Sequence, residues 1–283
     1  MTSDGPSTTG PVAFVLLTFA ISWGFYAGWV LVPGLDSGTA TLLLLGGGLG
    51  PFAAALLLTW RRRDVSLRTW LRDRFRLRVP GRYYAFALVL PPVAVALAGL
   101  LHVGVFGATP ALDELPPLFE YPIFLGFVAL LGGGLEEPGW RGYLLPALQA
   151  RWRPLHAALL VGVVWFAWHL PLFLRPDFVQ AGIPLWLYGP QVVAMSVVLT
   201  WLTNAARGAV VPAVLLHAGA NAGVNFYPAG GAAGGTSVVG YGLLTSAVVL
   251  AAVVLVLVGE PGALGDDRRV VDPPVERPAG ASD

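Results

Sequence analysis

Two adjacent carboxylates, Glu136 and Glu137, interrupt a long apolar run, and Arg141 follows four residues after the second. On a helix, Glu137 and Arg141 share a face with the acid nearer the N-terminus, which is the favourable order for an ion pair. Glu136 points about 100° away around the same helix and has no such local partner. We therefore expect Glu137 and Arg141 to support a site in which Glu136 acts, with His169 and His217 as its candidate partners.

Two later apolar runs each carry a histidine with a chemically useful neighbour one helical turn away. Trp165 precedes His169, and His217 precedes Asn221. A carboxylate can act as a general base on water, and a histidine can orient that water or donate to an oxyanion. The amide of Asn221 can donate to the same developing charge. Together with Glu136, these side chains suit hydrolysis of a carbonyl compound such as a peptide bond.

The same residues also suit a metal. One carboxylate and two imidazoles, from Glu136, His169 and His217, could be three ligands of a zinc ion that keeps an open fourth position. The residue types alone do not choose between zinc and a water activated by glutamate.

Composition predicts that membrane-spanning helices position these side chains. Of the 283 residues, 56% are hydrophobic and 12% are charged, against about 25% charged residues in a soluble domain. The absence of cysteine excludes disulfides and thiolate chemistry. The chain has 17 basic and 16 acidic residues, so its charge says nothing about partners, and we expect no nucleic-acid partner. We predict an all-α, polytopic transmembrane bundle in the cell membrane.

Eight apolar runs predict eight spans within a single transmembrane domain of residues 11–258. The expected spans are 11–33, 39–60, 83–106, 121–150, 155–174, 184–206, 209–227 and 237–258. We expect residues 1–10 to be a disordered N-terminus and residues 259–283 a disordered cytoplasmic tail.

The arginines predict the orientation of this bundle. Nine of them lie between residues 61 and 82, interleaved with apolar side chains. With this segment in the cytoplasm, an even number of spans places both termini and most later arginines there too. The acidic stretch 107–120 then lies outside. The basic segment is typical of a cytoplasmic loop or of an amphipathic helix on anionic headgroups, so membrane lipid is an expected partner.

Three spans bring the polar groups to similar depth. Glu136, His169 and His217 lie about 21, 21 and 14 Å along their helices. Ionisable groups at such depth are costly and indicate a functional site. The glycines at 132–134 and Pro138, which lacks an N–H, predict a kinked or unwound helix around Glu136.

At these residues the chain resembles the CAAX-processing and bacteriocin-processing family of intramembrane proteases. The family motifs are Glu-Glu-x-x-x-Arg, then Phe-x-x-x-His, then His-x-x-x-Asn or Asp. Glu136, Glu137 and Arg141 match the first motif completely. His217 and Asn221 match the third.

The second motif is matched at His169, with Trp165 where the family has phenylalanine, so an aromatic ring is kept. The three motifs cover about residues 121–227, and the flanking spans match only in character. Three ordered motifs on separate apolar runs are a far more specific signal than any one of them.

The resemblance implies an endopeptidase similar to the eukaryotic enzyme that removes the last three residues of prenylated proteins. It implies that Glu136 activates water with help from His169. The implied oxyanion donors are His217 and Asn221, and the implied supporting residues are Glu137, Arg141 and Trp165. The chain has no His-Glu-x-x-His motif, so we favour water activated by glutamate and keep zinc as the alternative cofactor.

A non-catalytic membrane protein, such as a transporter, an immunity protein or a scaffold, is the competing hypothesis. The complete set of four polar residues favours the enzyme. A repeated pair of broken helices would favour a transporter, and the sequence shows none. His102 and His156 lack patterned neighbours and are interpreted as structural or interfacial. We expect a peptide or protein substrate that could be membrane-anchored, and nothing requires it to be prenylated.

Overall fold

The computed structural model describes residues 9–229, 237–258 and Leu264. Over these residues the protein is a helical bundle without a β-strand, in agreement with the predicted fold class, and an isolated bridge joins Pro110 and Ala229. Of the predicted disordered ends, residues 1–8 and all of 259–283 except Leu264 lie outside the described residues. Thr9 and Gly10 belong to the first helix.

The longer helices follow one another along the whole chain. They are α1 (Thr9–Leu31), α2 (Ser37–Gly48), α3 (Gly50–Trp60), α4 (Leu67–Arg74), α5 (Gly81–Gly104), α6 (Tyr121–Leu131), α9 (Pro154–His169), α10 (Leu185–Ala205), α11 (Val211–Gly223) and α12 (Val238–Val258). Between α6 and α9 the chain forms four short helical segments, which carry the carboxylates.

Six helical stretches of the described chain are long and apolar enough to cross a membrane, and the bent pair α2 and α3 would make a seventh. The remaining predicted span, 209–227, corresponds to α11, which has 13 residues. Such a helix is about 20 Å long, short of the ~30 Å hydrocarbon core. Arg207 and Gly208, both at positive φ, form the turn that delays its start. The described chain is therefore a multi-pass bundle with fewer full-length spans than the eight expected.

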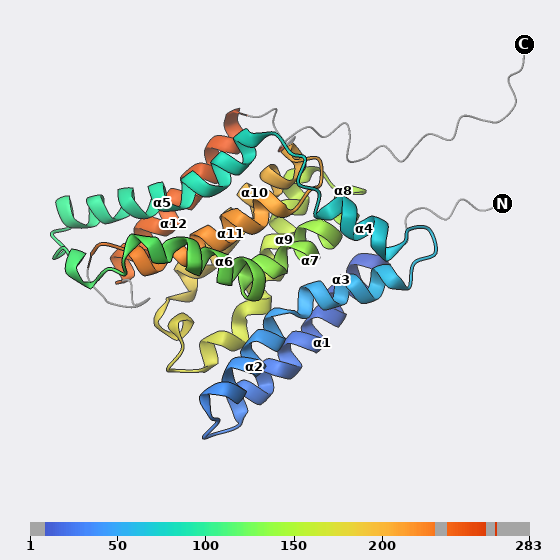
Figure 1. Cartoon of the computed structure of the whole chain (residues 1–283), viewed down its shortest axis with the longest axis horizontal. Coiled ribbons are helices and arrows are strands. Elements are labelled where there is room, and N and C mark those ends of the chain that lie inside the picture. The colour runs from blue at the N-terminus through green and yellow to red at the C-terminus, as the bar shows by residue number, and fades with distance from the viewer. Residues whose placement is uncertain (1–8, 230–236, 259–263, 265–283) are drawn as a thin grey trace, which may run out of the picture.

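Helices α9, α10 and α11 occupy the middle of the bundle (Figure 1), with α1 to α3 on one side and α5 and α12 on the other. Helix α10 packs against α9 and α12, and α11 packs against α5 and α6. The short segments after α6 contact α11 and α3. The three stretches that carry the sequence motifs therefore meet inside the protein.

Glycine allows the carboxylate segment to lie directly on α3. A Cβ atom at Gly139 would stand 2.5 Å from the backbone carbon and oxygen of Pro51. Close backbone approach of this kind is how small residues pack helices within a membrane.

The arginine-rich segment turns its apolar face toward the protein. Trp70 of α4 is buried, and its ring lies beside Gly142. Arg74 donates to the carbonyl of Gly208 at 3.2 Å, and Arg76 to that of Ala206 at 3.1 Å. The short amphipathic helix is thus docked on the bundle and closes the C-terminal end of α10, while most of its other arginines remain exposed.

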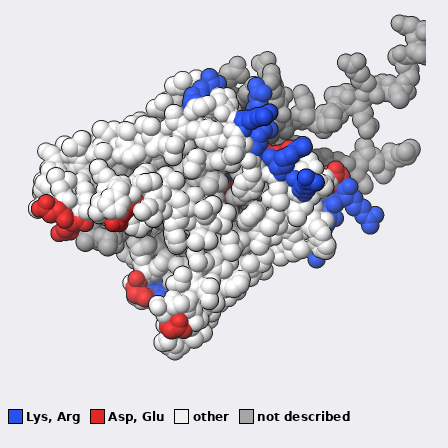
Figure 2. All heavy atoms as spheres, in the orientation of Figure 1, with Lys and Arg blue, Asp and Glu red and all other residues white. Residues whose placement is uncertain are grey.

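Charge is unevenly distributed over the visible face. In Figure 2 the basic side chains gather along one edge, over α4 and nearby helix ends, and most visible acidic groups lie far from that edge. A cytoplasmic basic edge is what the positive-inside rule predicts.

This orientation can be tested with single cysteines, because the chain has none of its own. Arg63 and Asp113 are both exposed, near α4 and in the acidic stretch respectively. In intact cells we expect a membrane-impermeant maleimide to label Asp113→Cys, and to label Arg63→Cys only after the membrane is opened. Labelling of Arg63→Cys in intact cells would overturn the predicted orientation.

Candidate active site

The helix that carries the carboxylates changes its winding three times. After Gly132, which leaves helical geometry at ψ −144°, the chain forms a 3-10 helix, η3 (Gly133–Glu136). Then follow one α-turn, α7 (Glu137–Gly139), a π-helix, η4 (Trp140–Leu144), and α8 (Leu145–Gln149). The deformation expected from the glycines and Pro138 is present, and π-helical turns are often found at functional sites.

Glu137 and Arg141 form a buried ion pair. The arginine NH1 atom lies 3.1 Å from Oε1 of the glutamate, and both side chains have 0% exposure. His217 of α11 places its Nδ1 atom 2.8 Å from the same oxygen. The predicted i,i+4 pair therefore exists, but His217 contacts Glu137 and not Glu136. Since the carboxylate accepts, His217 carries its proton on Nδ1.

Glu136 is held by two indoles. Its Oε2 atom accepts from Nε1 of Trp165 at 2.6 Å and from Nε1 of Trp140 at 3.3 Å. Neither histidine donates to it in the described part of the chain. Sequence reasoning missed Trp140, although it follows Glu136 at the i,i+4 spacing that paired Glu137 with Arg141.

His169 ends α9 and is oriented by its own helix. Its Nδ1 atom lies 2.8 Å from the carbonyl oxygen of Trp165. A carbonyl only accepts, so the proton sits on Nδ1 and Nε2 of a neutral ring is free to accept. The ring packs edge-on against Trp168 and Tyr188, with centroids at 4.7 and 5.4 Å.

Gly133 brings the third motif against the first. A Cβ atom at this position would lie 2.6 Å from Nε2 of His217 and 2.8 Å from Nδ2 of Asn221. Only a glycine leaves room for both side chains, and Asn221 is exposed beside it. The Nε2 atom of His217 and the amide of Asn221 therefore both lie beside the backbone of Gly133.

Trp165 joins these parts into one cluster. Its ring lies 5.6 Å from that of His169 and 5.1 Å from that of His217, measured between centroids. The Arg141 guanidinium sits 4.5 Å from its ring centroid, in a cation–π contact. Six of the seven residues predicted from the sequence are thus linked by direct contacts, and Asn221 joins them beside Gly133.

The residues of this cluster differ in how much of each is exposed. Glu136, His169 and His217 keep 6%, 7% and 5% exposure, whereas Glu137 and Arg141 have none. The first three residues are therefore buried but keep a small exposed fraction, whereas the ion pair has no exposed surface.

The described residues form no ready-made metal site. Among them, no three His, Cys, Asp or Glu side chains are grouped so that they could hold a metal ion. His217 turns Nδ1 toward Glu137 and not toward the predicted ligand Glu136.

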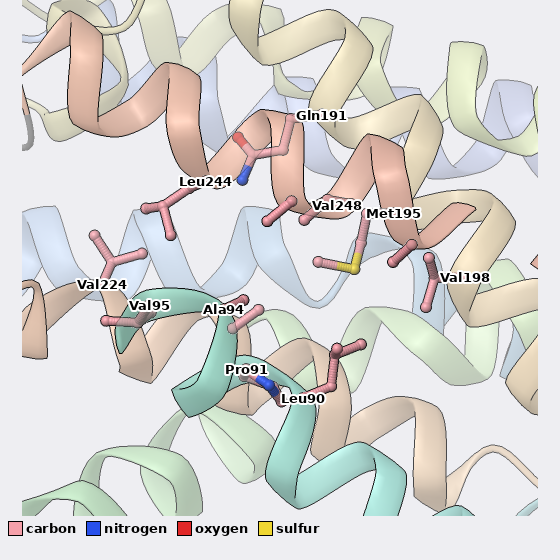
Figure 3. Close-up of a pocket in the computed structure, with 13 residues that line it drawn as sticks. Leu90, Pro91, Ala94, Val95, Gln191, Met195, Val198, Val224, Leu244 and Val248 are labelled. Carbon is pink, nitrogen blue, oxygen red and sulfur yellow. The ribbon is translucent and has the colours of Figure 1, made fainter. Parts of the chain in front are cut away.

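Two other features lie apart from the cluster. His102 is bonded to Tyr227 at 3.2 Å and Ser237 at 3.4 Å, and His156 is exposed, which agrees with structural and interfacial roles. A cavity of about 60 Å³ lies between α5, α10, α11 and α12 (Figure 3), where Gln191 and Met195 reach into the space. None of the predicted site residues lines this cavity.

Comparisons with known proteins agree with the motif pattern. A model of the type II CAAX prenyl endopeptidase Rce1-like family matches residues 117–223. The "CAAX prenyl protease 2" of Methanococcus maripaludis is 26% identical over 223 residues, which cover 73% of this chain and 81% of that protein. Both matches support membership in the CAAX-processing and bacteriocin-processing protease family. The resemblance noted from the motifs is confirmed, and residues 117–223 contain all seven residues of the cluster.

The two carboxylates should differ in their effect on stability. Glu137→Gln leaves the Arg141 charge buried without a counter-charge, so we expect the free energy of unfolding to fall by about 3 kcal/mol. Glu136→Gln keeps an oxygen that can accept from both indoles, and we expect a loss of under about 1 kcal/mol. Thermal unfolding of the two variants in detergent micelles measures the difference. Equal losses would contradict the division of roles between the two residues.

Proposed function

We propose that this protein is an intramembrane endopeptidase of the cell membrane that hydrolyses a peptide bond with water activated by Glu136. The observation that carries the proposal is the contrast between the two neighbouring carboxylates. Glu137 is ion-paired with no exposed surface, while Glu136 keeps 6% exposure, is anchored through Oε2 and has no ion-pair partner among the described residues. A positioned carboxylate of this kind is suited to act as a general base.

The comparisons support the reaction class. The related protein of known name is a CAAX prenyl protease, and the matching family is that of a CAAX prenyl endopeptidase. A peptide or protein substrate anchored in the bilayer, with its scissile bond near the C-terminus, is consistent with both. Membrane lipid would surround the bundle and deliver such a substrate by lateral diffusion.

The proposed reaction begins with one water molecule between Glu136 and His169. The water gives one proton to Glu136, while its second hydrogen is held by Nε2 of His169, which is free because Nδ1 donates to Trp165. The water oxygen bonds to the carbonyl carbon of the scissile peptide, and the carbonyl oxygen becomes an oxyanion.

His217 and Asn221 would stabilise that oxyanion. The amide Nδ2 of Asn221 donates directly. A protonated His217 donates from Nε2, while its Nδ1 donates to Glu137. When the intermediate collapses, the C–N bond breaks and Glu136 returns its proton to the leaving nitrogen. The products are a carboxylic acid, which keeps the second hydrogen of the water, and an amine; transfer of that proton to the amine or to solvent leaves the carboxylate.

Loss of the general base should abolish cleavage. We expect Glu136→Gln to lower kcat on a prenylated CAAX-type peptide, assayed with purified protein in lipid vesicles, by about 10³-fold. Asp113→Asn, in the exposed acidic stretch, is the matched carboxylate control and should retain full activity. Comparison of protein C-termini in membranes that contain each variant extends the test to unknown substrates. Undiminished cleavage by Glu136→Gln would refute the proposed role.

The water-activation mechanism also predicts indifference to chelators. We expect the purified protein to contain far less than one zinc per chain and to keep its activity after dialysis against a chelator. Elemental analysis of wild type and His169→Ala gives the decisive comparison. Stoichiometric zinc that is lost in His169→Ala would establish the metal mechanism instead.

A further inference from the structure

We propose that Trp165 and Trp140 form an indole clamp on Oε2 of Glu136, and that this clamp assigns Oε1 as the oxygen that takes the proton from water. The inference rests on the proposed function and adds to it the atom that reacts and the positioning residues that select it.

Both indole N–H groups point to one oxygen. The Nε1 atoms of Trp165 and Trp140 lie 2.6 and 3.3 Å from Oε2 of Glu136. No described residue donates a hydrogen bond to Oε1. An indole is a donor only and has no lone pair with which to accept.

This donor chemistry separates the two oxygens. A proton on Oε2 would point at two indole N–H groups that cannot accept it, and at least one of the two hydrogen bonds would be lost. A proton on Oε1 leaves both bonds intact. The general base therefore cycles between its two states without moving its anchored oxygen, which keeps Oε1 in place for the attacking water.

The stronger donor is itself fixed. Trp165 is 3% exposed, and its ring is held by the Arg141 guanidinium on its face and by His217 at 5.1 Å between centroids. The second donor, Trp140, is fully buried, between the rings of Phe14 and Trp168. Neither indole can rotate without unpacking its neighbours, so the clamp exists before substrate binds.

The clamp depends on the one place where this chain departs from the family motif. Phenylalanine, which the second motif has at this position, would supply the ring but no N–H. Trp165→Phe therefore restores the motif residue and removes the 2.6 Å hydrogen bond. If the ring alone mattered, this variant would be fully active.

The chain also offers a matched control. Trp29 lies on α1 and is 4% exposed, and its ring contacts Phe178 and Arg175, which are outside the cluster. Trp29→Phe removes a comparable volume from the core and breaks no side-chain hydrogen bond to Glu136.

The test compares kcat and KM of these variants on the peptide substrate in vesicles. For Trp165→Phe we expect kcat to fall about 10- to 100-fold, the range for losing a hydrogen bond to a charged group, with KM within about twofold of wild type. Trp140→Phe should lose less, because its bond is longer. Trp29→Phe should keep kcat within about threefold of wild type. A wild-type kcat in Trp165→Phe, or equal losses in Trp165→Phe and Trp29→Phe, would overturn the clamp.

Two further measurements separate the clamp from packing defects and from the proposed protease activity. Benzothienylalanine at position 165 replaces the N–H by sulfur without changing the ring's shape, and it should reproduce the loss seen with phenylalanine. Full activity of that variant would refute the clamp. The infrared carboxylate band that disappears in Glu136→Gln should shift in Trp165→Phe, whether or not the protein cleaves the peptide. A folded wild type without cleavage refutes the protease, whereas an unshifted band refutes the clamp.

Discussion

The structure depends on an ion pair that lies in an apolar interior without any contact with solvent. A buried arginine and a buried glutamate are tolerated only when each has partners, because a single uncompensated charge in such surroundings is very costly. Glu137 and Arg141 meet this demand within one helical turn, and they recruit His217 from α11 and the ring of Trp165 from α9. The charge pair therefore ties three separate helices to one point.

That arrangement gives two chemically identical neighbours different environments. The winding of the chain changes from 3-10 to α between Glu136 and Glu137, so the two side chains leave the backbone in different directions. One enters the fully buried ionic cluster, and the other accepts from neutral indole donors. Neither environment would suit the other's role, since a fully buried, ion-paired carboxylate has no exposed surface on which to meet a water molecule.

The sequence was informative wherever a relation was local. The Glu137–Arg141 pair, the deformation near the glycines and Pro138, and the helical membrane class follow from spacing and composition within one segment. The predicted partner of His217 was wrong because the choice between adjacent carboxylates depends on how α11 packs against η3, which no periodicity encodes. The Trp140–Glu136 hydrogen bond was not predicted, because a tryptophan in an apolar run is interpreted as a packing residue although it lies at the right spacing to donate.

The length of α11 and the packing of α4 could not be predicted from local sequence patterns. An apolar run of nineteen residues, 209–227, predicted a full span, yet the turn at Arg207 and Gly208 and the end of α11 at Gly223 leave a short helix. The segment that contains α4 was expected to be a cytoplasmic loop or a helix on the lipid headgroups. Its apolar face instead packs on the bundle, where Trp70 is buried beside Gly142, a neighbour that is distant in sequence.

The π-helix at Trp140–Leu144 has a consequence for how this segment tolerates change in length. A π-helical turn holds one more residue than the α-helical turn it replaces. Deleting one residue there would yield a regular α-helix with good hydrogen bonds, yet it would rotate everything before it by about 100° relative to α8. Both carboxylates would then face the wrong neighbours in a chain that had lost none of its motif residues. The segment is thus more sensitive to the number of its residues than to the identity of most of them.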